Sequence, residues 1–503
     1  MGAPAVDRPA NWTQRAAALA IDGRALIDGQ RRDATSGETF DCISPIDGRV
    51  LGAVARGTAA DIDAAVKSAR AAFEDRRWCG KAPAVRKKIL QRFADKILGA
   101  REELALLETL DMGKPIQHAL SVDVPSTART IAWYAEAVDK IYDEIAPTPA
   151  TALALITREP VGVVGAIVPW NYPMIMAAWK LGPALAAGNS VVLKPSEKSP
   201  LTAMRLAELA IEAGLPPGVF NVVPGYGPEA GEALALHMDV DALGFTGSTR
   251  TGRRMLEYAG RSNLKRVFNE LGGKSAFLVF DDCADVERAA KTVAASLFFN
   301  QGESCNAPSR VLVHESIAQR FTEIVAAEAP KYAPGHPLDA GTVLGALVDE
   351  PQMATVLRYI EAGKAEGARV VSGGRRVRQD TGGYYVEPTV FDGVVNHMTI
   401  AREEIFGPVM GILTFKTEAE AVAIANASAY GLQASVWSDH LSRAHRVARA
   451  LHAGTVHVNQ YDEDDITVPF GGVKQSGNGR DKSLHAFDKV TELKTTWIRI
   501  DPA

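Results

Sequence analysis

The alternation of short apolar runs with helical segments after Val161 restricts the fold of this chain more than any other feature. This alternation is typical of a parallel sheet whose strands are connected by helices. The predicted strands of a first series are 161–168, 190–193, 219–223, 241–245 and 276–280, and the predicted helices are 173–187, 200–214, 227–237 and 249–260. We predict an α/β, Rossmann-like, doubly wound nucleotide-binding domain.

A second α/β series follows residue 305. Its predicted strands are 310–314, 369–372, 411–415, 434–437 and 455–458, with helices at 316–330, 351–366, 418–428 and 440–452. We expect these residues to form a separate catalytic domain. The predicted division is 1–143 and 161–274 for the nucleotide-binding domain, 275–485 for the catalytic domain, and 144–160 with 486–503 for a small β arm.

The N-terminal region and the two arm segments complete the prediction. Residues 1–55 indicate loops and short strands, and helical spacing follows at 62–73, 89–98 and 122–142, with Gly113 and Pro115 as stop signals between the last two. Residues 146–158 and 490–500 alternate in polarity. They either pair in an oligomerisation sheet or form edge strands of one domain.

Composition excludes several classes of function. The chain has 503 residues, 47% of them hydrophobic, with a net charge of -5 and a pI near 6.1. These values give no basic surface for nucleic acid, so we expect a small-molecule partner. The longest nearly apolar run, 161–170, is too short to span a bilayer, and the N-terminus lacks a signal peptide pattern.

The four cysteines point to a reducing compartment. Cys42, Cys79, Cys283 and Cys305 show neither a disulfide pattern nor metal-ligand spacing, so we predict a cytoplasmic protein without a metal site. Cys305 lies in the polar segment FFNQGESCNAPS (298–309). A reactive thiolate needs such a polar setting, whereas a free cysteine is otherwise a small buried hydrophobe.

Two glycine-rich turns compete as the dinucleotide site. Residues 225–231 have the spacing GxGxxxG, one residue longer than the dinucleotide fingerprint, and residues 245–252 (FTGSTRTG) also lie between a strand and a helix. Either can be a turn whose glycines serve geometry alone.

Three further segments carry polar groups at strand ends. Glu197 in KPSE (194–197) can accept the hydroxyls of a ribose or form a surface ion pair with Lys194. Glu270 in ELGGK is a general base or a solvated loop residue. Asn171, held between Pro169 and Pro173, can donate to an oxyanion or satisfy a turn.

Together these segments resemble the aldehyde dehydrogenase superfamily over residues 25–500. The bacterial branch acting on γ-glutamyl-γ-aminobutyraldehyde or 4-guanidinobutyraldehyde is the most similar. The matching segments occur in family order: PWNYP (169–173), KPSE (194–197), FTGSTRTG (245–252), ELGGKS (270–275), NQGESC (300–305), EEIFGP (403–408) and PFGG (469–472).

The resemblance implies a role for each matching position. Cys305 is the nucleophile, Glu270 the general base and Asn171 an oxyanion donor with the Cys305 backbone N–H, and Lys180 belongs to the same catalytic set. The implied cofactor residues are Ile167, Trp170, Lys194, Ser196, Glu197, Gly227, Phe245, Gly247, Ser248, Leu271, Glu404 and Phe406. The implied substrate residues are Asp123, Tyr172, Trp179, Ser304, Asp464 and Phe470.

The implied chemistry is oxidation of an aldehyde to a carboxylic acid. Cys305 thiolate adds to the aldehyde, hydride leaves from the thiohemiacetal, and water activated by Glu270 hydrolyses the thioester. Glu197 favours NAD, and Lys194 with Ser196 can accept NADP. The family habit is a homodimer or homotetramer that uses the arm. A thiol esterase would need Cys305, Asn171 and Glu270 but not the intact GSTRTG and KPSE segments.

Four consecutive carboxylates at 462–465 precede PFGG, where the family places the mouth of its substrate tunnel. Asp464 occupies a position where many members have an aromatic residue, and we expect Asp123 to add charge near the entrance. Carboxylates there favour a cationic or amide-bearing tail. We therefore predict an ω-amino, guanidino or γ-glutamylamino butyraldehyde from putrescine or arginine breakdown. The alternative is an enzyme of broad specificity for aliphatic and aromatic aldehydes.

Overall fold

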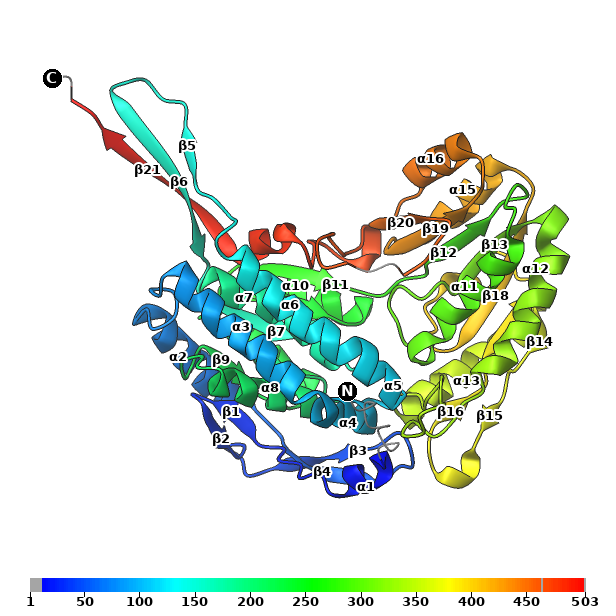
Figure 1. Cartoon of the computed structure of the whole chain (residues 1–503), viewed down its shortest axis with the longest axis horizontal. Coiled ribbons are helices and arrows are strands. Elements are labelled where there is room, and N and C mark those ends of the chain that lie inside the picture. The colour runs from blue at the N-terminus through cyan, green and yellow to red at the C-terminus, as the bar shows by residue number, and fades with distance from the viewer. Residues whose placement is uncertain (1–10, 463–464, 502–503) are drawn as a thin grey trace, which may run out of the picture.

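The computed structural model describes residues 11–462 and 465–501 of the chain. In Figure 1 the chain forms two lobes side by side, and a narrow sheet projects from the first lobe. Each lobe is built on a seven-stranded sheet. The N-terminal segment at the bottom of Figure 1 contains α1 (Trp12–Ala17) and the hairpin of β3 (Thr39–Ile43) and β4 (Val50–Ala55). No helix within the described residues combines the length and apolar character that crossing a membrane requires.

The first sheet has the order β11-β10-β7-β8-β9-β1-β2. Its strands β7 to β11 run parallel, and β1 pairs antiparallel with β9 and β2. The strand order reverses between β7 and β10, and ligands of doubly wound sheets bind in the crevice at such a point. The strands are β7 (Val163–Ile167), β8 (Ser190–Lys194), β9 (Phe220–Val222), β10 (Ala242–Thr246), β11 (Arg266–Glu270), β1 (Ala25–Ile27) and β2 (Gln30–Arg32).

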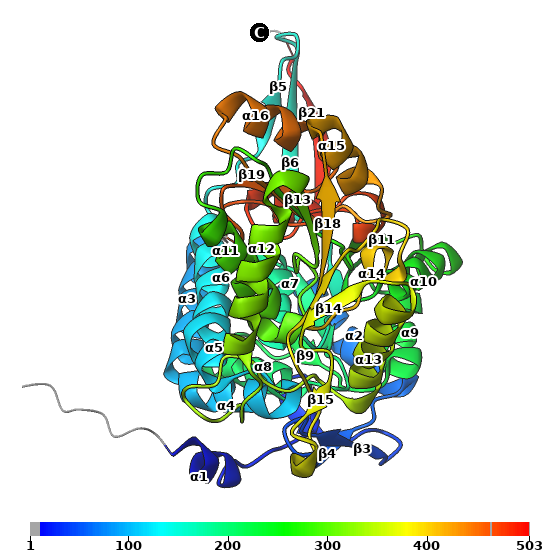
Figure 2. The ribbon, with the colours of Figure 1, turned by 90° about the vertical axis from the view of Figure 1, so that its right-hand side faces the viewer.

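Helices cover both faces of this sheet, as Figure 2 shows. Side chains alternate along each strand, so Val164 and Ala166 of β7 enter one core and Val163 and Ile167 enter the other. α3 (Pro83–Gly99), α6 (Val124–Ala137), α7 (Pro173–Ala187) and α8 (Leu201–Glu212) cover the first face; α2 (Ala59–Glu74), α9 (Glu232–Leu236) and α10 (Thr249–Arg261) cover the second. α4 (Arg101–Met112) ends at Gly113, whose φ of 88° is left-handed.

The second sheet has the order β14-β17-β18-β13-β12-β19-β20. β12 (Ala276–Val279) lies between β13 and β19, so the placement of strand 276–280 in the first series was wrong. The other strands are β13 (Arg310–His314), β14 (Arg369–Ser372), β17 (Thr389–Asp392), β18 (Val409–Phe415), β19 (Gln433–Trp437) and β20 (Thr455–Val458). The helices are α11 (Val286–Phe298), α12 (Glu315–Glu328), α13 (Glu350–Ala365), α14 (Thr399–Arg402), α15 (Glu418–Asn426) and α16 (Leu441–Ala450), and β15 (Arg376–Val377) pairs with β16 (Tyr385–Val386).

The sequence prediction missed β11 and β17 and made two helices too long. β11 reads RVFNE, whose polar residues hide the strand pattern. The helix predicted at 122–142 is α6, which ends at Ala137 and follows α5 (Ile116–His118) and a π-helical turn over Ala119–Asp123. The helix predicted at 227–237 is a π-helical turn, Gly227–Gly231, followed by the short α9.

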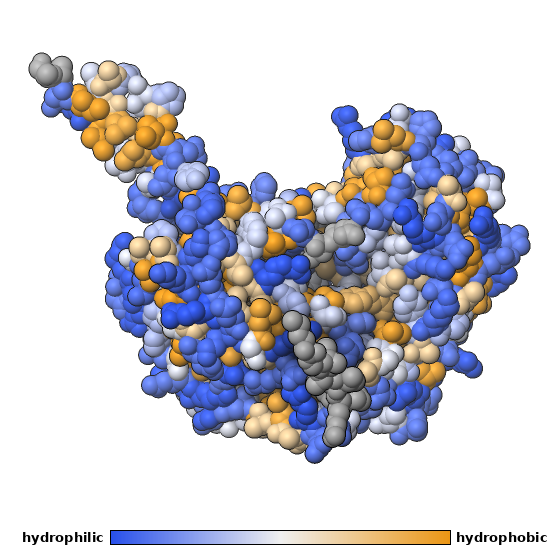
Figure 3. All heavy atoms as spheres, in the orientation of Figure 1, coloured by the Kyte–Doolittle hydropathy of each residue, from blue (hydrophilic) through white to orange (hydrophobic). Residues whose placement is uncertain are grey.

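The projecting sheet pairs the two alternating segments with each other, one of the two alternatives left open by the sequence, and has the order β21-β6-β5. β6 (Ala152–Pro160) pairs antiparallel with β5 (Glu144–Ala146) and, along nine residue pairs, with β21 (Thr491–Arg499). The alternative, edge strands of a main domain, is excluded because neither segment joins a seven-stranded sheet. Figure 3 shows apolar residues gathered on this arm, where Ile145 and Trp497 are 71% and 66% exposed.

Candidate active site

Cys305 is presented by an unusual turn after α11. Asn300, Gln301 and Gly302 have positive φ values of 48°, 59° and 71° in succession. A Cβ at Gly302 would lie 2.3 Å from the backbone oxygen of Gly407, so this position requires glycine. The turn places Cys305 in the loop that leads into β13, between the two sheets.

Glu270, the last residue of β11, lies beside the thiol. Burial raises the pKa of Glu270 to about 8, with nearby Lys180 lowering it and Asp481 raising it. Neither carboxylate oxygen has a hydrogen-bond partner among the described residues. Burial also raises the pKa of Cys305, and the negative charge of Glu270 raises it further. The pair therefore consists of a protonated thiol at rest and an adjacent group that can take up a proton near neutral pH.

A buried charge cluster lies behind Glu270. The Asp481 carboxylate accepts hydrogen bonds from the ammonium groups of both Lys180 on α7 and Lys489. Their charges hold the pKa of Asp481 below its usual range although burial opposes this. Burial lowers the pKa of Lys489 to about 8, so the cluster loses positive charge as the pH rises through that value. Lys180, which the resemblance placed in the catalytic set, thus contacts Asp481 directly and acts on Glu270 through its charge.

Asn171 and Tyr172 contact the two residues that precede Cys305. The Asn171 side-chain amide donates to the Glu303 backbone oxygen at 2.8 Å, and the Asn300 amide donates to the Asn171 backbone oxygen at 3.1 Å. An amide group has two N–H donors, so one remains for a ligand. The Tyr172 hydroxyl lies 2.7 Å from Ser304 Oγ. Neither Asn171 nor Ser304 is among the residues that line the pocket around Cys305.

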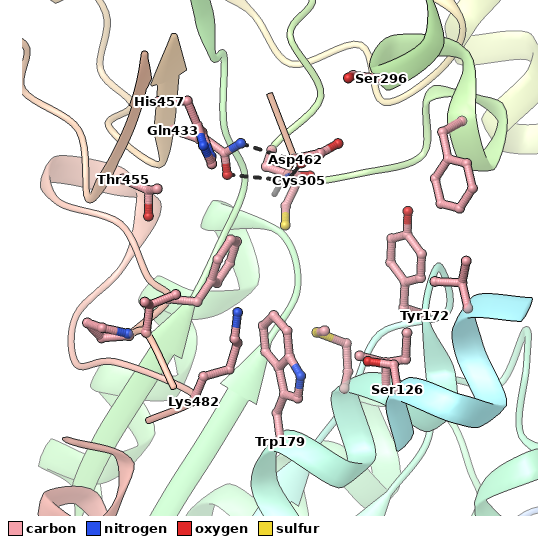
Figure 4. A pocket seen from close by; sticks show the side chains of 18 of the residues that line it. Ser126, Tyr172, Trp179, Ser296, Cys305, Gln433, Thr455, His457, Asp462 and Lys482 are labelled. Carbon is pink, nitrogen blue, oxygen red and sulfur yellow. Dashed lines mark hydrogen bonds between the residues drawn. The ribbon is translucent and has the colours of Figure 1, made fainter. Parts of the chain in front are cut away.

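A pocket of about 430 Å³ opens onto Cys305. Figure 4 shows the Cys305 sulfur pointing into the space between Tyr172, Trp179 and Lys482. Tyr172, Trp179 and Phe470 form aromatic walls, which agrees with the positions implied for them. Further lining residues are Val122, Ser126, Ile175, Met176, Ala295, Ser296, Phe299, Asn306, Gln433, Thr455, His457, Asp462, Val468, Pro469 and Lys482.

Asp123 is not at the entrance of the pocket, so that expectation was wrong. The π-helical turn before α6 directs it into the protein, where it is fully buried and accepts a hydrogen bond from Lys114 Nζ at 2.6 Å. Lys114 Nζ also lies 4.4 Å from the centroid of the Tyr172 ring. Asp123 therefore lies behind the pocket wall and does not line it. Asp464 lies outside the described residues.

Most of the implied cofactor residues gather at the carboxyl ends of the parallel strands in the first sheet. Ile167, Lys194 and Phe245 lie at or near the ends of β7, β8 and β10, and Trp170, Ser196 and Glu197 lie in the loops that follow β7 and β8. Lys194 Nζ is buried and lies 3.0 Å from Glu197 Oε2. Ser248 caps α10, and a Cβ at Gly247 would lie 2.6 Å from the Phe245 ring.

The second lobe contributes two more of the implied cofactor residues, Glu404 and Phe406. The Gly273 N–H donates to Glu404 Oε1 at 2.9 Å, and a Cβ at Gly272 would lie 2.1 Å from Glu404 Oε2. Burial raises the pKa of Glu404 to about 7. The Phe406 ring packs edge-on against Trp170 with centroids 5.2 Å apart. Leu271 directly follows Glu270, the last residue of β11. Gly227 borders open space, because a Cβ at this position would meet no described atom within 4 Å.

These residues fit a dinucleotide. The first-turn N–H groups of α10 suit a pyrophosphate, Lys194 and Glu197 suit a ribose, and Glu404 with Phe406 reaches the region next to Cys305. No group of His, Cys, Asp and Glu side chains within the described ranges is arranged to hold a metal ion.

Several polar residues of the site were not predicted from the sequence. Lys482 and Asp481 follow the matching segment PFGG (469–472), and no sequence pattern marked them. His457, Gln433 and Lys489 also had no signal, because each is near the site only through long-range packing. Asp462 was predicted only as one member of the acidic run.

The sequence of this chain is similar to those of known proteins. The model described as the aldehyde dehydrogenase family matches residues 32–496. The chain is 52% identical over 492 residues to the NADP/NAD-dependent aldehyde dehydrogenase PuuC of Escherichia coli (strain K12), covering 98% of this chain and 99% of that protein.

Two solved structures are also similar. One is a mutant of the indole-3-acetaldehyde dehydrogenase AldA of P. syringae in complex with NAD+ and IAA, with 61% identity, a TM-score of 0.97, and coverage of 97% of this chain and 99% of that chain. The other is a γ-glutamyl-γ-aminobutyraldehyde dehydrogenase from Burkholderia cenocepacia J2315, with 57% identity, a TM-score of 0.96, and coverage of 98% and 99%.

Proposed function

Because the chain belongs to the aldehyde dehydrogenase family and is an NAD-dependent aldehyde dehydrogenase, we propose that Cys305 is its nucleophile and Glu270 its general base. The observation that supports these roles is the buried Glu270 carboxylate, which lies beside the Cys305 thiol and interacts with it. A thiol with a raised pKa needs a base when it attacks, and a carboxylate with a pKa near 8 is suited to receive the proton.

In the proposed mechanism the thiolate adds to the aldehyde carbonyl. The Cys305 backbone N–H and the second N–H of Asn171 stabilise the oxyanion of the thiohemiacetal. NAD supplies the acceptor for the hydride that leaves carbon. Glu270 releases the thiol proton to solvent, and its carboxylate then deprotonates the water that hydrolyses the thioester. Hydrolysis releases the carboxylic acid, and return of a proton from Glu270 to the leaving thiolate restores the thiol.

For the cofactor we propose that Lys194, Ser196 and Glu197 hold the adenine ribose, and Gly247 with Ser248 the pyrophosphate. Glu404 and Phe406 would hold the nicotinamide riboside. Glu197 suits a free 2'-hydroxyl, so NAD is preferred, and the adjacent Lys194 allows NADP as well. Gly227 borders the adenine.

The substrate that we propose is an ω-amino, guanidino or γ-glutamylamino butyraldehyde. The Burkholderia relative is named for γ-glutamyl-γ-aminobutyraldehyde, and Asp462 supplies a carboxylate in the pocket. The second candidate is an enzyme of broad specificity for aliphatic and aromatic aldehydes. It is favoured by the rings of Tyr172, Trp179 and Phe470 and by the relative named for indole-3-acetaldehyde.

We further propose that the arm mediates assembly into a homodimer or homotetramer in the cytoplasm. Its exposed apolar side chains, Ile145, Leu493 and Trp497, support an interface between copies of the chain. We also propose that residues 1–143 and 161–274 form the NAD-binding domain, residues 275–485 the catalytic domain, and residues 144–160 with 486–503 the arm.

A panel of about ten aldehydes, each assayed with NAD and NADP, tests the substrate assignment. We expect the highest kcat/KM for an amine-derived aldehyde with NAD. If hexanal, benzaldehyde and indole-3-acetaldehyde are all oxidised with higher kcat/KM than any amine-derived aldehyde, the broad-specificity alternative holds.

A further inference from the structure

Lys489 is the second of two lysines that share one carboxylate behind Glu270. The Lys180 ammonium on α7 donates to Asp481 Oδ2, and the Lys489 ammonium donates to Asp481 Oδ1. Asp481 is 2% exposed and Lys489 is 7% exposed. Both oxygens of a buried carboxylate therefore accept a hydrogen bond from a lysine.

A small cavity of about 10 Å³ connects these lysines to the base. Its lining includes Lys180, Glu270, Asp481 and Lys489, and none of the four lines the substrate pocket. Glu270 ends β11, and Lys489 ends a 3₁₀-helical turn over Leu484–Lys489, just before β21. Lys489 is thus placed to act on Glu270 without contacting the space that an aldehyde would occupy.

The charges of the four side chains balance only when Glu270 is ionised. One lysine is enough to neutralise one carboxylate, and Lys180 already pairs with Asp481. Among the described residues, Lys489 forms an ion pair only with this same Asp481, and the negative charge of Glu270 favours the ammonium form of Lys489. A buried charge is costly unless an opposite charge compensates it. An ammonium at this position therefore favours the carboxylate form of Glu270.

Other titratable groups near the cavity do not replace Lys489. Arg480 also lines the cavity, but its guanidinium donates to two backbone oxygens and is partly exposed, so water screens its charge. Burial raises the pKa of Tyr134, so its hydroxyl stays neutral. The charge of Glu404 raises the pKa of Glu270 and thus opposes its ionisation.

We propose that Lys489 is a positioning residue for the general base, which holds Asp481 jointly with Lys180 and supplies the second positive charge that lets Glu270 ionise in a buried site. This inference rests on the proposed function, in which Glu270 takes up the proton of the Cys305 thiol. The pKa values of Glu270 and Lys489 are both about 8, so the two groups titrate as a coupled pair. Once Glu270 is ionised, its charge holds the proton on Lys489 more tightly.

Infrared spectroscopy can follow the ionisation of Glu270 without turnover. The signal is the pH-dependent carboxylic acid band that Glu270→Gln lacks, and its midpoint in the wild type should lie at about 8. Lys489→Met and Lys489→Gln should raise this midpoint by about one unit, because both remove the charge. Lys489→Arg keeps the charge and should leave the midpoint close to that of the wild type.

The variants separate the charge of Lys489 from its hydrogen bond. Lys489→Gln keeps a donor for Asp481, so a shift in Lys489→Met alone would assign the effect to the hydrogen bond and overturn the proposal. An unchanged midpoint in both neutral variants, or an equal shift in Lys489→Arg, also overturns it. Lys331→Met is the matched control and should shift nothing, because Lys331 forms an exposed ion pair with Glu328 and does not line the cavity.

Turnover distinguishes this inference from the proposed function. The pH profile of kcat in Lys489→Met should shift upward equally for two aldehydes with different tails, because Lys489 does not line the substrate pocket. If the infrared midpoint shifts but the kcat profile does not, Glu270 is not the base and the proposed function fails, while the effect of Lys489 on Glu270 is supported. Thermal unfolding of each variant shows whether the fold is retained, and Lys489→Gln serves as the neutral variant if Lys489→Met does not fold.

Discussion

The two ends of the substrate pocket are built on different principles. At the reacting end, burial sets the protonation of Cys305 and Glu270, and a positive charge cluster lies behind the base. Elsewhere in the pocket, Lys482 lies against the rings of Trp179 and Phe470, and Asp462 is a further lining residue. The carbonyl group of every aldehyde reacts in the same way at the first end, whereas only some aldehydes have a tail that fits the second. Substitutions at the reacting end should therefore lower the rate for all aldehydes, and those at the tail end should change the ratio between them.

The largest effect is expected from Cys305→Ala. Loss of the nucleophile should lower kcat by about 10⁴-fold or more for every aldehyde, because no other group can form the covalent intermediate. The measurement is formation of the reduced dinucleotide with a cationic, an acidic and an apolar aldehyde. Cys79→Ala is the control, since that thiol lies outside the pocket. Retained oxidation of any of the three aldehydes would refute the proposed mechanism.

Glu270→Gln should lower kcat by about 10² to 10³-fold, again for all aldehydes. In the wild-type enzyme, the base is active when deprotonated, so the rate should rise with pH through about 8 and level off above it. The variant should lack this rise. A pH profile that is unchanged in the variant would assign the base to another residue.

The same substitution should also change stability. The raised pKa of Glu270 means that the folded protein binds this proton more tightly than the unfolded chain does. The free energy of unfolding therefore falls as pH rises from about 4.5 to about 8. Glu270→Gln removes this loss, so its melting temperature should exceed that of the wild type at pH 9 more than at pH 4.

A smaller effect is expected from Lys180→Met. The variant removes a positive charge behind Glu270, and the midpoint of the pH profile should move upward from about 8 by about one unit. Asp481 keeps its ion pair with Lys489, so no buried carboxylate is left unpaired. The measurement is kcat as a function of pH for two aldehydes with different tails. A shift seen with only one of them would contradict the division between the two ends.

The smallest effect is expected from Asp462→Asn at the tail end. This variant should lower kcat/KM for a cationic aldehyde about three- to ten-fold relative to hexanal, and high salt should weaken the difference in the wild type. Asp465→Asn is the control, because Asp465 lies in the same acidic run but bonds to Thr467 and does not line the pocket. If Asp462→Asn leaves the ratio of kcat/KM for the cationic aldehyde to that for hexanal unchanged, the Asp462 charge does not select the substrate.

The reacting end was more accessible to sequence prediction than the tail end. Strands such as β8 and β13 follow clear apolar patterns, so the ends that carry Lys194 and its neighbours were located correctly. The residue pattern left two interpretations of Cys305 and Glu270 open, and their implied roles came from the resemblance. Local sequence alone could not show that β11 brings Glu270 to the thiol, because the pattern RVFNE hides that strand.

At the tail end, long-range packing decided the outcome. Asp123 was expected at the entrance, but the π-helical turn directs it inward to Lys114, nine residues earlier in the chain. Lys482 reaches the pocket because two successive left-handed residues turn the backbone there, although neither is the glycine that usually marks such a conformation. Lys482 lines the pocket only when its segment packs against Trp179 of α7, and no local sequence pattern indicates that contact.

The pairing of β6 with β21 has a consequence for synthesis of the chain. Thr157 and Lys494 bond across these strands but are separated by 337 residues. At about 5 to 20 residues per second, β6 leaves the ribosome about 20 seconds to a minute before its partner strand exists. During that time its edge is open to other strands. Phe470 and Lys482 are also synthesised late, so the strands of the first sheet can pair well before the substrate pocket is complete.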